Sequence, residues 1–483
     1  MTPLLRRRPR LRGRSPARTA LPVAAVLPVA TVLLALTAAA VAPAAVAGAG
    51  TTSRPTVVAH HPAVHAATAK SSSAIQHVII VIQSGHSFDN YFGTRPGVDG
   101  IPAGVCQQVL TNSKSCVKPY HLSSDQARAG LSDTLRVTGK AIDAGKMDGF
   151  VSAQPNASIG SLAMGHHDGS DLPYYWNLAD RFTLFDHFYA ASQAGTLPNR
   201  LAAVSGQTTG LTSNTPPASG ISAPTVFDQL DQANLSWKYY VQGYPFKSVT
   251  PGERSRVPIL AMPAVTGNPT SAAHVAGTGQ YFTDLAAGHL PAVSYVASSS
   301  GDSERSPQSP AQGQAFVESL VNALMQSPEW SHTALLLTYD DSGGWYDNAV
   351  PPTVGGVTWG LRVPAILVSP YARAGQVDSQ QLDTASIPGF IDQTFHLPPL
   401  TSQISTAGDL MSGLDLQQAP ISPAIPSHVT LVGARPAVPV IYVLYLGALL
   451  AVGIVIALAF RRTRPGPGSS APAGPGPAPG VPV

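Results

Sequence analysis

The sequence predicts an α/β fold built on a mostly parallel sheet. The first observation is a continuous β-branched run, Val78 to Ile82, which is apolar at every position. Such a run is typical of a strand that is buried on both faces. The second observation is a similar run, Ala334 to Tyr339, and the third is an amphipathic helical pattern from Gln312 to Met325. Polar residues follow both runs, and ligand sites of open α/β sheets lie beyond the carboxyl ends of strands.

The other elements follow from patterns of the same kind. A loop rich in Gly and Pro follows the first strand over 94–119, because turn-forming residues interrupt any periodic pattern there. Alternating or continuous apolar residues predict strands, and a period of three to four residues predicts a helix. We expect strands at 235–241, 291–296 and 362–371 and a helix at 125–144. The sequence contains no internal repeat.

The two ends carry signals of export and of membrane attachment. An arginine-rich start precedes an uncharged Ala/Val/Leu stretch that ends in Ala45-Val46-Ala47, which resembles a signal peptide with its cleavage site. An uncleaved anchor is the alternative, because the stretch is long. Residues 437–460 are uncharged and long enough to span a bilayer, and Arg461 follows at once. A buried core helix is the alternative there.

These signals predict a cell-membrane protein with one spanning helix. Positive charge marks the cytoplasmic side, so we expect the main domain outside and the C-terminal tail in the cytoplasm. The predicted segments are a signal peptide at 1–47, a flexible linker at 48–74, a main domain at 75–402, a Pro/Ser/Ala-rich linker at 403–436, the membrane helix at 437–460 and a Pro/Gly-rich tail at 461–483.

Composition narrows the classes of function. The 483 residues leave room for one large domain with appendages. The formal net charge is only +3 and the arginines gather at the two ends, so we expect no nucleic-acid partner. Cys106 and Cys116 are the two cysteines, and in an exported protein this pair predicts a local disulfide. A reduced pair is the alternative.

The stretch from His77 to Thr94 reads HVIIVIQSGHSFDNYFGT. It resembles the opening motif of the bacterial phosphoesterase family, which includes phospholipases C and an acid phosphatase. Gln83 and the run Ser87 to Thr94 match that motif, and further blocks match in order up to residue 399. The resemblance implies an alkaline-phosphatase-like three-layer α/β/α sandwich. It also implies hydrolysis of phosphate ester bonds.

The resemblance assigns the chemistry to three residues. In Gly195-Thr196-Leu197-Pro198-Asn199 the hydroxyl residue of the family motif is the nucleophile, which corresponds to Thr196. A hydroxyl attacks phosphorus only where a metal or a base activates it. Asp340 and Asp341 match the paired aspartates that bind metal in the family. Packed like charges need a cation or a shared proton, so a divalent metal such as calcium or magnesium is implied.

Other site positions of the family carry different residues here. The family's Glu and Asn ligands are replaced by Ser84 and Gly85, and four histidine positions are occupied by Asp133, Arg305, Asn348 and Thr384. Metal binding is therefore expected to be weakened or absent. An arginine cannot act as a general acid near neutral pH, although it binds phosphate in a fork. The possible ligand-binding residues are Ser84, His86, Asn199, Arg305 and Asn348.

Three functions remain open, so whether the chain is an enzyme stays undecided at this stage. The first is a phosphoesterase with a rebuilt site and weak or lost activity, since positioned proton transfer by the missing histidines contributes ~10²–10⁴-fold. The second is a pocket that binds a phosphate ester, a lipid head group or a wall polymer without hydrolysis. The third is a surface scaffold without a ligand.

Overall fold

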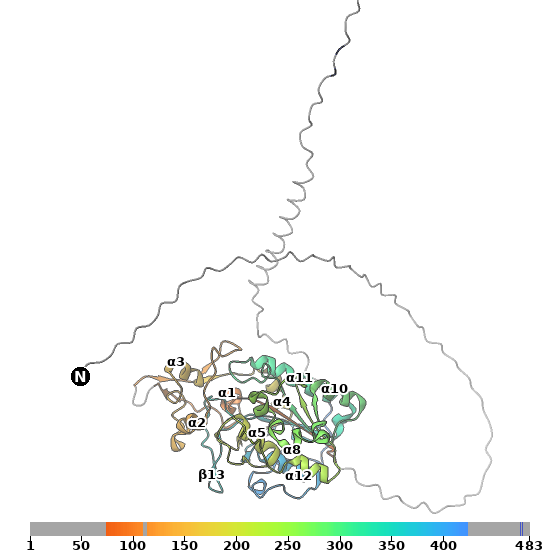
Figure 1. The fold of residues 1–483 in the computed structure, drawn as a ribbon. Helices are drawn as coiled ribbons and strands as arrows, with labels where there is room; N and C mark the ends of the chain where they lie inside the picture. Colours follow the sequence, from red (N-terminus) through yellow and green to blue (C-terminus); the bar gives the residue numbers. More distant parts are fainter. Residues whose placement is uncertain (1–73, 110–113, 424–473, 475, 477–483) are drawn as a thin grey trace, which may run out of the picture. The chain divides into compact units, whose positions relative to one another are not determined.

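The structure, a computed structural model, describes residues 74–109, 114–423, 474 and 476 (Figure 1). The predicted signal peptide, nearly all of the N-terminal linker and the predicted membrane segment lie outside the described residues. So does the predicted tail, apart from residues 474 and 476.

One eight-stranded mixed sheet forms the centre of the described chain, in the order β15-β6-β14-β11-β1-β10-β8-β9. Its strands, in chain order, are β1 His77–Gln83, β6 Thr183–Phe185, β8 Trp237–Val241, β9 Val275–Gly277, β10 Val293–Ala297, β11 Thr333–Tyr339, β14 Ala365–Val368 and β15 Val377–Asp378. β14 pairs antiparallel with both of its neighbours, and the remaining pairs are parallel. The predicted α/β class with a mostly parallel sheet is confirmed.

The other elements are helices and short two-residue strands. The helices are α1 Phe88–Phe92, α2 Leu135–Ile142, α3 Ala157–Gly160, α4 Pro173–Arg181, α5 Thr196–Ser205, α6 Val226–Gln232, α7 Pro251–Arg256, α8 Pro263–Thr266, α9 Pro269–Ala272, α10 Thr278–Ala287, α11 Pro310–Gln326 and α12 Ser386–Phe395. The short strands are β2 Gln107–Gln108, β3 Cys116–Val117, β4 Tyr120–His121, β5 Gly165–His166, β7 Phe188–Tyr189, β12 Thr353–Val354, β13 Val357–Thr358 and β16 Leu382–Asp383.

Two groups of helices pack against the sheet. α11 contacts α4 and α10, and the hydroxyl of Tyr281 in α10 donates to the carbonyl of Leu320 in α11. α5 contacts α6, α7 and α12, and the hydroxyl of Tyr295 in β10 donates to the carbonyl of Ala203 in α5. Figure 1 shows α10 and α11 on one side of the strands and α5 and α12 on the other. This covering explains why the central strands β1 and β11 are apolar on both faces.

Two predicted elements are shorter than expected. The helix predicted at 125–144 is limited to α2, because the carboxylate of Asp125 accepts hydrogen bonds from Ser309 and Ala311 at the start of α11. These bonds tie the stretch before α2 to another element. The strand predicted at 362–371 is limited to β14, since Pro364 lacks the N–H that a ladder needs.

The disulfide and the end of the domain complete the fold. Cys106 and Cys116 are bonded, as predicted, and they staple the β2–β3 hairpin. The packed chain continues past residue 402, where a linker was expected. Leu410 is buried, and the carbonyl of Ile421 accepts a hydrogen bond from the indole of Trp330.

Within the described residues, no helix is both long enough and apolar enough to cross a membrane. This finding contradicts the predicted localisation as a single-pass cell-membrane protein, and we withdraw that prediction. It rested on the length and apolarity of residues 437–460, which are necessary for a span but do not establish one.

Candidate active site

The predicted site residues gather beyond the carboxyl ends of three central strands. β10, β1 and β11 are adjacent and parallel. Their register pairs Gln83 with Tyr339, so the next residues, Ser84 and Asp340, lie side by side. Ser84 Oγ donates to Asp340 Oδ2 at 2.9 Å. The loop after β10 brings Arg305 to the same edge of the sheet, where α/β proteins bind ligands.

Thr196 is the first residue of α5 and is almost fully buried. Its Oγ1 donates to Asp341 Oδ2 at 3.2 Å and accepts from Arg305 Nη2 at 2.8 Å. Asn199 shapes the preceding turn, because its amide donates to the carbonyls of Ser192 and Gly195 and accepts from the Ser192 N–H. The structure therefore brings the predicted nucleophile into contact with one of the two predicted aspartates. It also gives Asn199 a supporting position.

The guanidinium of Arg305 lies among three carboxylates. Its Nη1 is 2.5 Å from Asp133 Oδ2, and its Nη2 is 2.5 Å from Asp341 Oδ2 and 3.8 Å from Asp340 Oδ1. Burial alone would lower the pKa of Arg305, but the three aspartates outweigh burial and raise it. For Asp133, burial favours a higher pKa, but the guanidinium of Arg305 outweighs burial and lowers the pKa of this carboxyl. Arg305 is thus a fixed cation at the centre of the site.

A second arginine, which the sequence analysis did not single out, neutralises Asp340. The fully buried Arg200 of α5 places Nε 2.8 Å from Asp340 Oδ2, and its Nη2 donates to Ser84 Oγ at 3.0 Å. The same Nη2 donates to the carbonyl of Ile82 at 2.9 Å. An arginine four residues after Thr196 carries no signal in the sequence that would mark it as a partner of Asp340.

The carboxylate oxygens of Asp340 and Asp341 do not fit the needs of a divalent cation. Both oxygens of Asp340 accept hydrogen bonds, Oδ1 from the N–H of Gly85 and Oδ2 from Ser84 and Arg200. Both oxygens of Asp341 are also engaged, Oδ1 by the N–H of Gly343 and Oδ2 by Thr196 and Arg305. Calcium and magnesium need about six oxygen ligands, several of them anionic or carbonyl. The oxygens that would serve are already bonded to protein donors.

A polar pocket opens above these residues. It has a volume of about 380 Å³, within the range of small-molecule sites. Ser84, Thr196, Ser255, Arg256, Ser303 and Arg305 contribute to its lining. The described residues that line it include two arginines and neither Asp nor Glu. Burial and the charge of Arg200 lower the pKa of Arg256. The pocket is therefore suited to an anion.

Glu304 anchors the loop that carries Arg305. Its side chain is fully buried, and its carboxylate accepts hydrogen bonds from the hydroxyls of Tyr91, Tyr175 and Tyr339 at 2.5–2.7 Å. The amide of Gln83 donates a further bond at 2.9 Å. Burial raises the pKa of Glu304 to about 7, although the four donors oppose this shift. The sequence analysis missed Glu304 as well, because its partners come from separate segments.

Two other predicted ligand-binding residues lie away from this pocket. Both ring nitrogens of His86 are engaged, with the Asn90 side chain at 2.6 Å and the Glu304 carbonyl at 2.8 Å, and burial lowers its pKa to about 3. Asn348 belongs to a separate cluster around the buried Arg362, whose Nη2 donates to the Asn348 amide oxygen at 2.5 Å. The residues that line the pocket include neither side chain.

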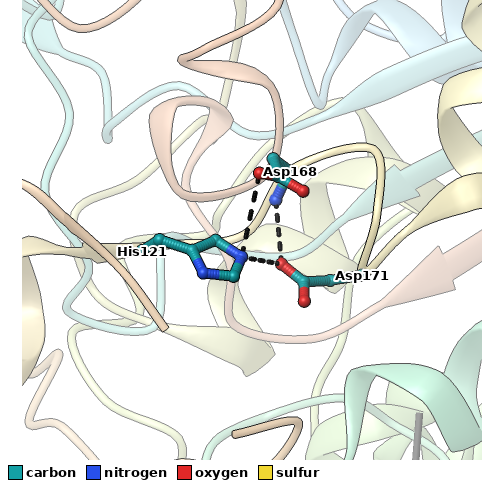
Figure 2. Close-up of side chains that lie close together, drawn as sticks. All are labelled: His121, Asp168 and Asp171. Carbon is teal, nitrogen blue, oxygen red and sulfur yellow. Dashed lines mark hydrogen bonds and ion pairs between the residues drawn. The ribbon is translucent and has the colours of Figure 1, made fainter. Parts of the chain in front are cut away.

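A group of His and Asp side chains outside the pocket carries donors that a metal could use (Figure 2). His121 Nε2 is 2.7 Å from Asp171 Oδ2 and 3.8 Å from Asp168 Oδ2. His121 ends β4, which pairs with β5, and both aspartates follow β5 in the chain. The sequence analysis did not identify this group, because His121 is separated from the aspartates by more than forty residues.

Comparison with known proteins decides the family. The Phosphoesterase family matches residues 75–398, about two thirds of the chain. The chain belongs to the phosphoesterase family. At the level of the family, this membership supports phosphate ester hydrolysis, and enzymes of the family are typically metal-dependent.

Relatives in the family carry phospholipase names. The chain is 29% identical over 383 residues to a non-hemolytic phospholipase C of Pseudomonas aeruginosa, covering 66% of this chain and 54% of that one. It is 27% identical over 434 residues to phospholipase C A of Mycobacterium tuberculosis, covering 76% and 82%. The chain thus spans about half of the first relative and most of the second. A phosphonate monoester hydrolase structure from Agrobacterium radiobacter matches with a TM-score of 0.37 at 11% identity, covering 70% of this chain and 77% of that one.

Proposed function

We propose that this phosphoesterase-family chain binds the phosphate group of a phosphate ester above Thr196 and hydrolyses it slowly. The observation that carries the proposal is the position of Thr196 Oγ1, which donates to Asp341 and accepts from Arg305 on the wall of an anion-suited pocket. A guanidinium that already donates to the nucleophile oxygen is placed to stabilise negative charge developing there.

The same contacts supply a route for the chemistry. Thr196 Oγ1 donates to Asp341 Oδ2, so this carboxylate is placed to accept the Thr196 proton. The threonine oxygen then forms a bond to phosphorus, and the ester oxygen leaves with its electron pair and takes a proton from water. The hydroxide left from that water attacks the phosphorus of the phosphothreonine, the bond from phosphorus to the threonine oxygen breaks, and Asp341 returns its proton to that oxygen.

The expected rate is low for a stated reason. The described residues that line the pocket include no histidine to protonate the leaving oxygen. Positioned proton transfer contributes ~10²–10⁴-fold, so turnover is expected to fall short of a histidine-equipped site by about that factor. The same observation favours a second candidate function, a pocket that binds a phosphate-bearing lipid head group or wall polymer without cleaving it.

Substrate, fold and location extend the proposal. The phospholipase C names of the relatives support a phosphodiester of the lipid head-group class. The mixed sheet with helices on both sides supports an alkaline-phosphatase-like sandwich at 75–402. The disulfide supports export, with a signal peptide at 1–47 and a linker at 48–74, because such bonds persist in oxidising compartments.

Turnover and binding are measured separately to test this. The full chain is assayed for release of p-nitrophenol from bis(p-nitrophenyl) phosphate, and inorganic phosphate binding is followed by calorimetry. We expect slow turnover that is lost in Thr196→Ala while phosphate binding is kept. Thr283→Ala, an exposed hydroxyl change in α10, is the control and retains both.

Each other result has a defined meaning. Phosphate binding without turnover in the unmodified chain selects the non-catalytic pocket. Turnover that persists unchanged in Thr196→Ala refutes the assignment of the nucleophile. Absence of both binding and turnover refutes the proposed function.

A further inference from the structure

We propose that the guanidinium of Arg305 takes the place of a divalent cation at this site, so that the chain uses the site without a metal ion. The inference deepens the proposed function and rests on it for the role of the pocket. The inference can be tested without measuring turnover, because it concerns which cation neutralises the buried aspartates.

Three carboxylates converge on the guanidinium of Arg305. Asp133, Asp340 and Asp341 come from two distant segments of the chain, and each has an oxygen within 3.8 Å of an Arg305 nitrogen. Buried carboxylates that face each other repel unless a cation lies between them. The guanidinium meets that need and donates directly to the oxygens of Asp133 and Asp341.

Gly85 leaves space for the side chain of Arg305. A Cβ atom at this position would lie 3.2 Å from Cγ of Arg305 and 3.4 Å from its Cζ. A longer side chain at position 85 would therefore compete with the arginine for the same volume. Position 85 therefore has no side chain that could bind a metal, and the side chain of Arg305 passes through the space that such a side chain would fill.

The loop that carries the guanidinium is held in place by protein contacts alone. Glu304, the preceding residue, is clamped by three tyrosine hydroxyls and by Gln83. Gly313 of α11 leaves room for this side chain, because a Cβ there would lie 2.1 Å from Cγ of Glu304. A cation fixed by its neighbours does not need to be recruited from solution.

A divalent ion and the guanidinium would compete for the same oxygens. An ion bound to Asp340 and Asp341 would have to displace Arg305 from Asp341 and Arg200 or backbone donors from Asp340. Displacing Arg305 leaves it only the carboxylate of Asp133, and displacing Arg200 leaves a fully buried guanidinium without its carboxylate, which is unfavourable. The arginines therefore exclude the ion.

The test follows Mn²⁺ uptake and thermal stability of the full chain. Asp168→Asn is introduced into every protein, so that the exposed group with His121 does not contribute. Mn²⁺ is titrated by calorimetry, and melting temperatures are compared in EDTA and in Mn²⁺. The variants are Arg305→Ala, which removes the cation, Arg305→Lys, which keeps a charge, and the control Arg128→Ala, an exposed arginine outside the site.

We expect the background protein, Arg305→Lys and Arg128→Ala to show no saturable Mn²⁺ uptake and equal melting temperatures in EDTA and Mn²⁺. We expect Arg305→Ala to gain saturable Mn²⁺ uptake and a melting temperature that rises with Mn²⁺. Saturable uptake by the background protein that disappears on Asp340→Asn overturns the inference. A folded Arg305→Ala that takes up no Mn²⁺ overturns it as well.

The design separates this inference from the proposed function. If Arg305→Ala does not fold, the Mn²⁺ titration of the background protein still tests the inference. Saturable Mn²⁺ uptake that is lost on Asp340→Asn contradicts the inference, and absence of saturable uptake agrees with it. Phosphate binding is measured in EDTA on the same background protein. Loss of phosphate binding with no Mn²⁺ uptake refutes the function and leaves the identity of the cation standing.

Discussion

Replacing Glu304 with Gln tests how a buried carboxylate holds the loop that carries Arg305. The substitution keeps the size and shape of the side chain but removes its ability to ionise. In the structure Glu304 is fully buried and accepts four hydrogen bonds, and burial raises its pKa to about 7 from an ordinary value of 4.5. The carboxylate is therefore easier to protonate in the folded chain than in the unfolded chain.

The magnitude follows from that difference. The difference between a pKa of about 7 and one of 4.5, at ~1.36 kcal/mol for each unit of pKa, corresponds to roughly 3 kcal/mol. Because the folded pKa is the higher one, the stability from this group is fully present below about pH 4.5 and is lost as the pH rises through about 7. Glutamine does not titrate. As the pH rises through this window, the free energy of unfolding of the variant should therefore increase by about 3 kcal/mol relative to that of the unmodified chain.

The assay is urea unfolding of both proteins between about pH 5 and about pH 8. The difference between their free energies of unfolding cancels the shared titrations, including that of His86. Glu253→Gln is the matched control, because it makes the same chemical change at a half-buried position in the cap of α7, away from the Glu304 cluster. A flat difference for Glu304→Gln, or one that moves in the opposite direction, would refute the role of burial at Glu304.

Two further predictions concern the same edge of the sheet. Arg200→Met should lower the free energy of unfolding by about 3–5 kcal/mol, because it leaves Asp340 buried without this arginine. Adding Asp340→Asn should recover part of this loss. A loss under about 1 kcal/mol would contradict the pairing. Gly85→Ala should destabilise more than Gly97→Ala in urea unfolding. Both glycines have positive φ, but only at Gly85 would a Cβ meet the side chain of Arg305, so equal losses would show that this contact is unimportant.

The fold was accessible from the sequence where its signals are local. The apolar runs of β1 and β11 marked the central strands, and the amphipathic pattern marked α11, because burial of an element depends mainly on its own residues. The helix predicted at 125–144 failed at its first half. There the chain is held by Asp125 bonds to a segment more than 180 residues away, which no local pattern records.

The site was only half accessible. Motif matching found Thr196, Asp340 and Asp341, which the structure places together. It treated Arg305 as a phosphate ligand and gave Arg200 no role. Arg200 binds the carboxylate of Asp340, which lies 140 residues further along the chain. Arg305 binds the carboxylate of Asp341, which lies 36 residues further along the chain.

By itself, the sequence determined the α/β class, the phosphoesterase family, the cysteine pair and the likeness of Thr196 to a nucleophile, because periodicity and motifs are read along the chain. Only the tertiary structure decided which cation faces the buried aspartates. That choice depends on the register of β10, β1 and β11, which sets the loop of Arg305 beside those of Gly85 and Asp341. The charge balance of a site is a property of side chains brought together across strands, and it is not written in any one segment.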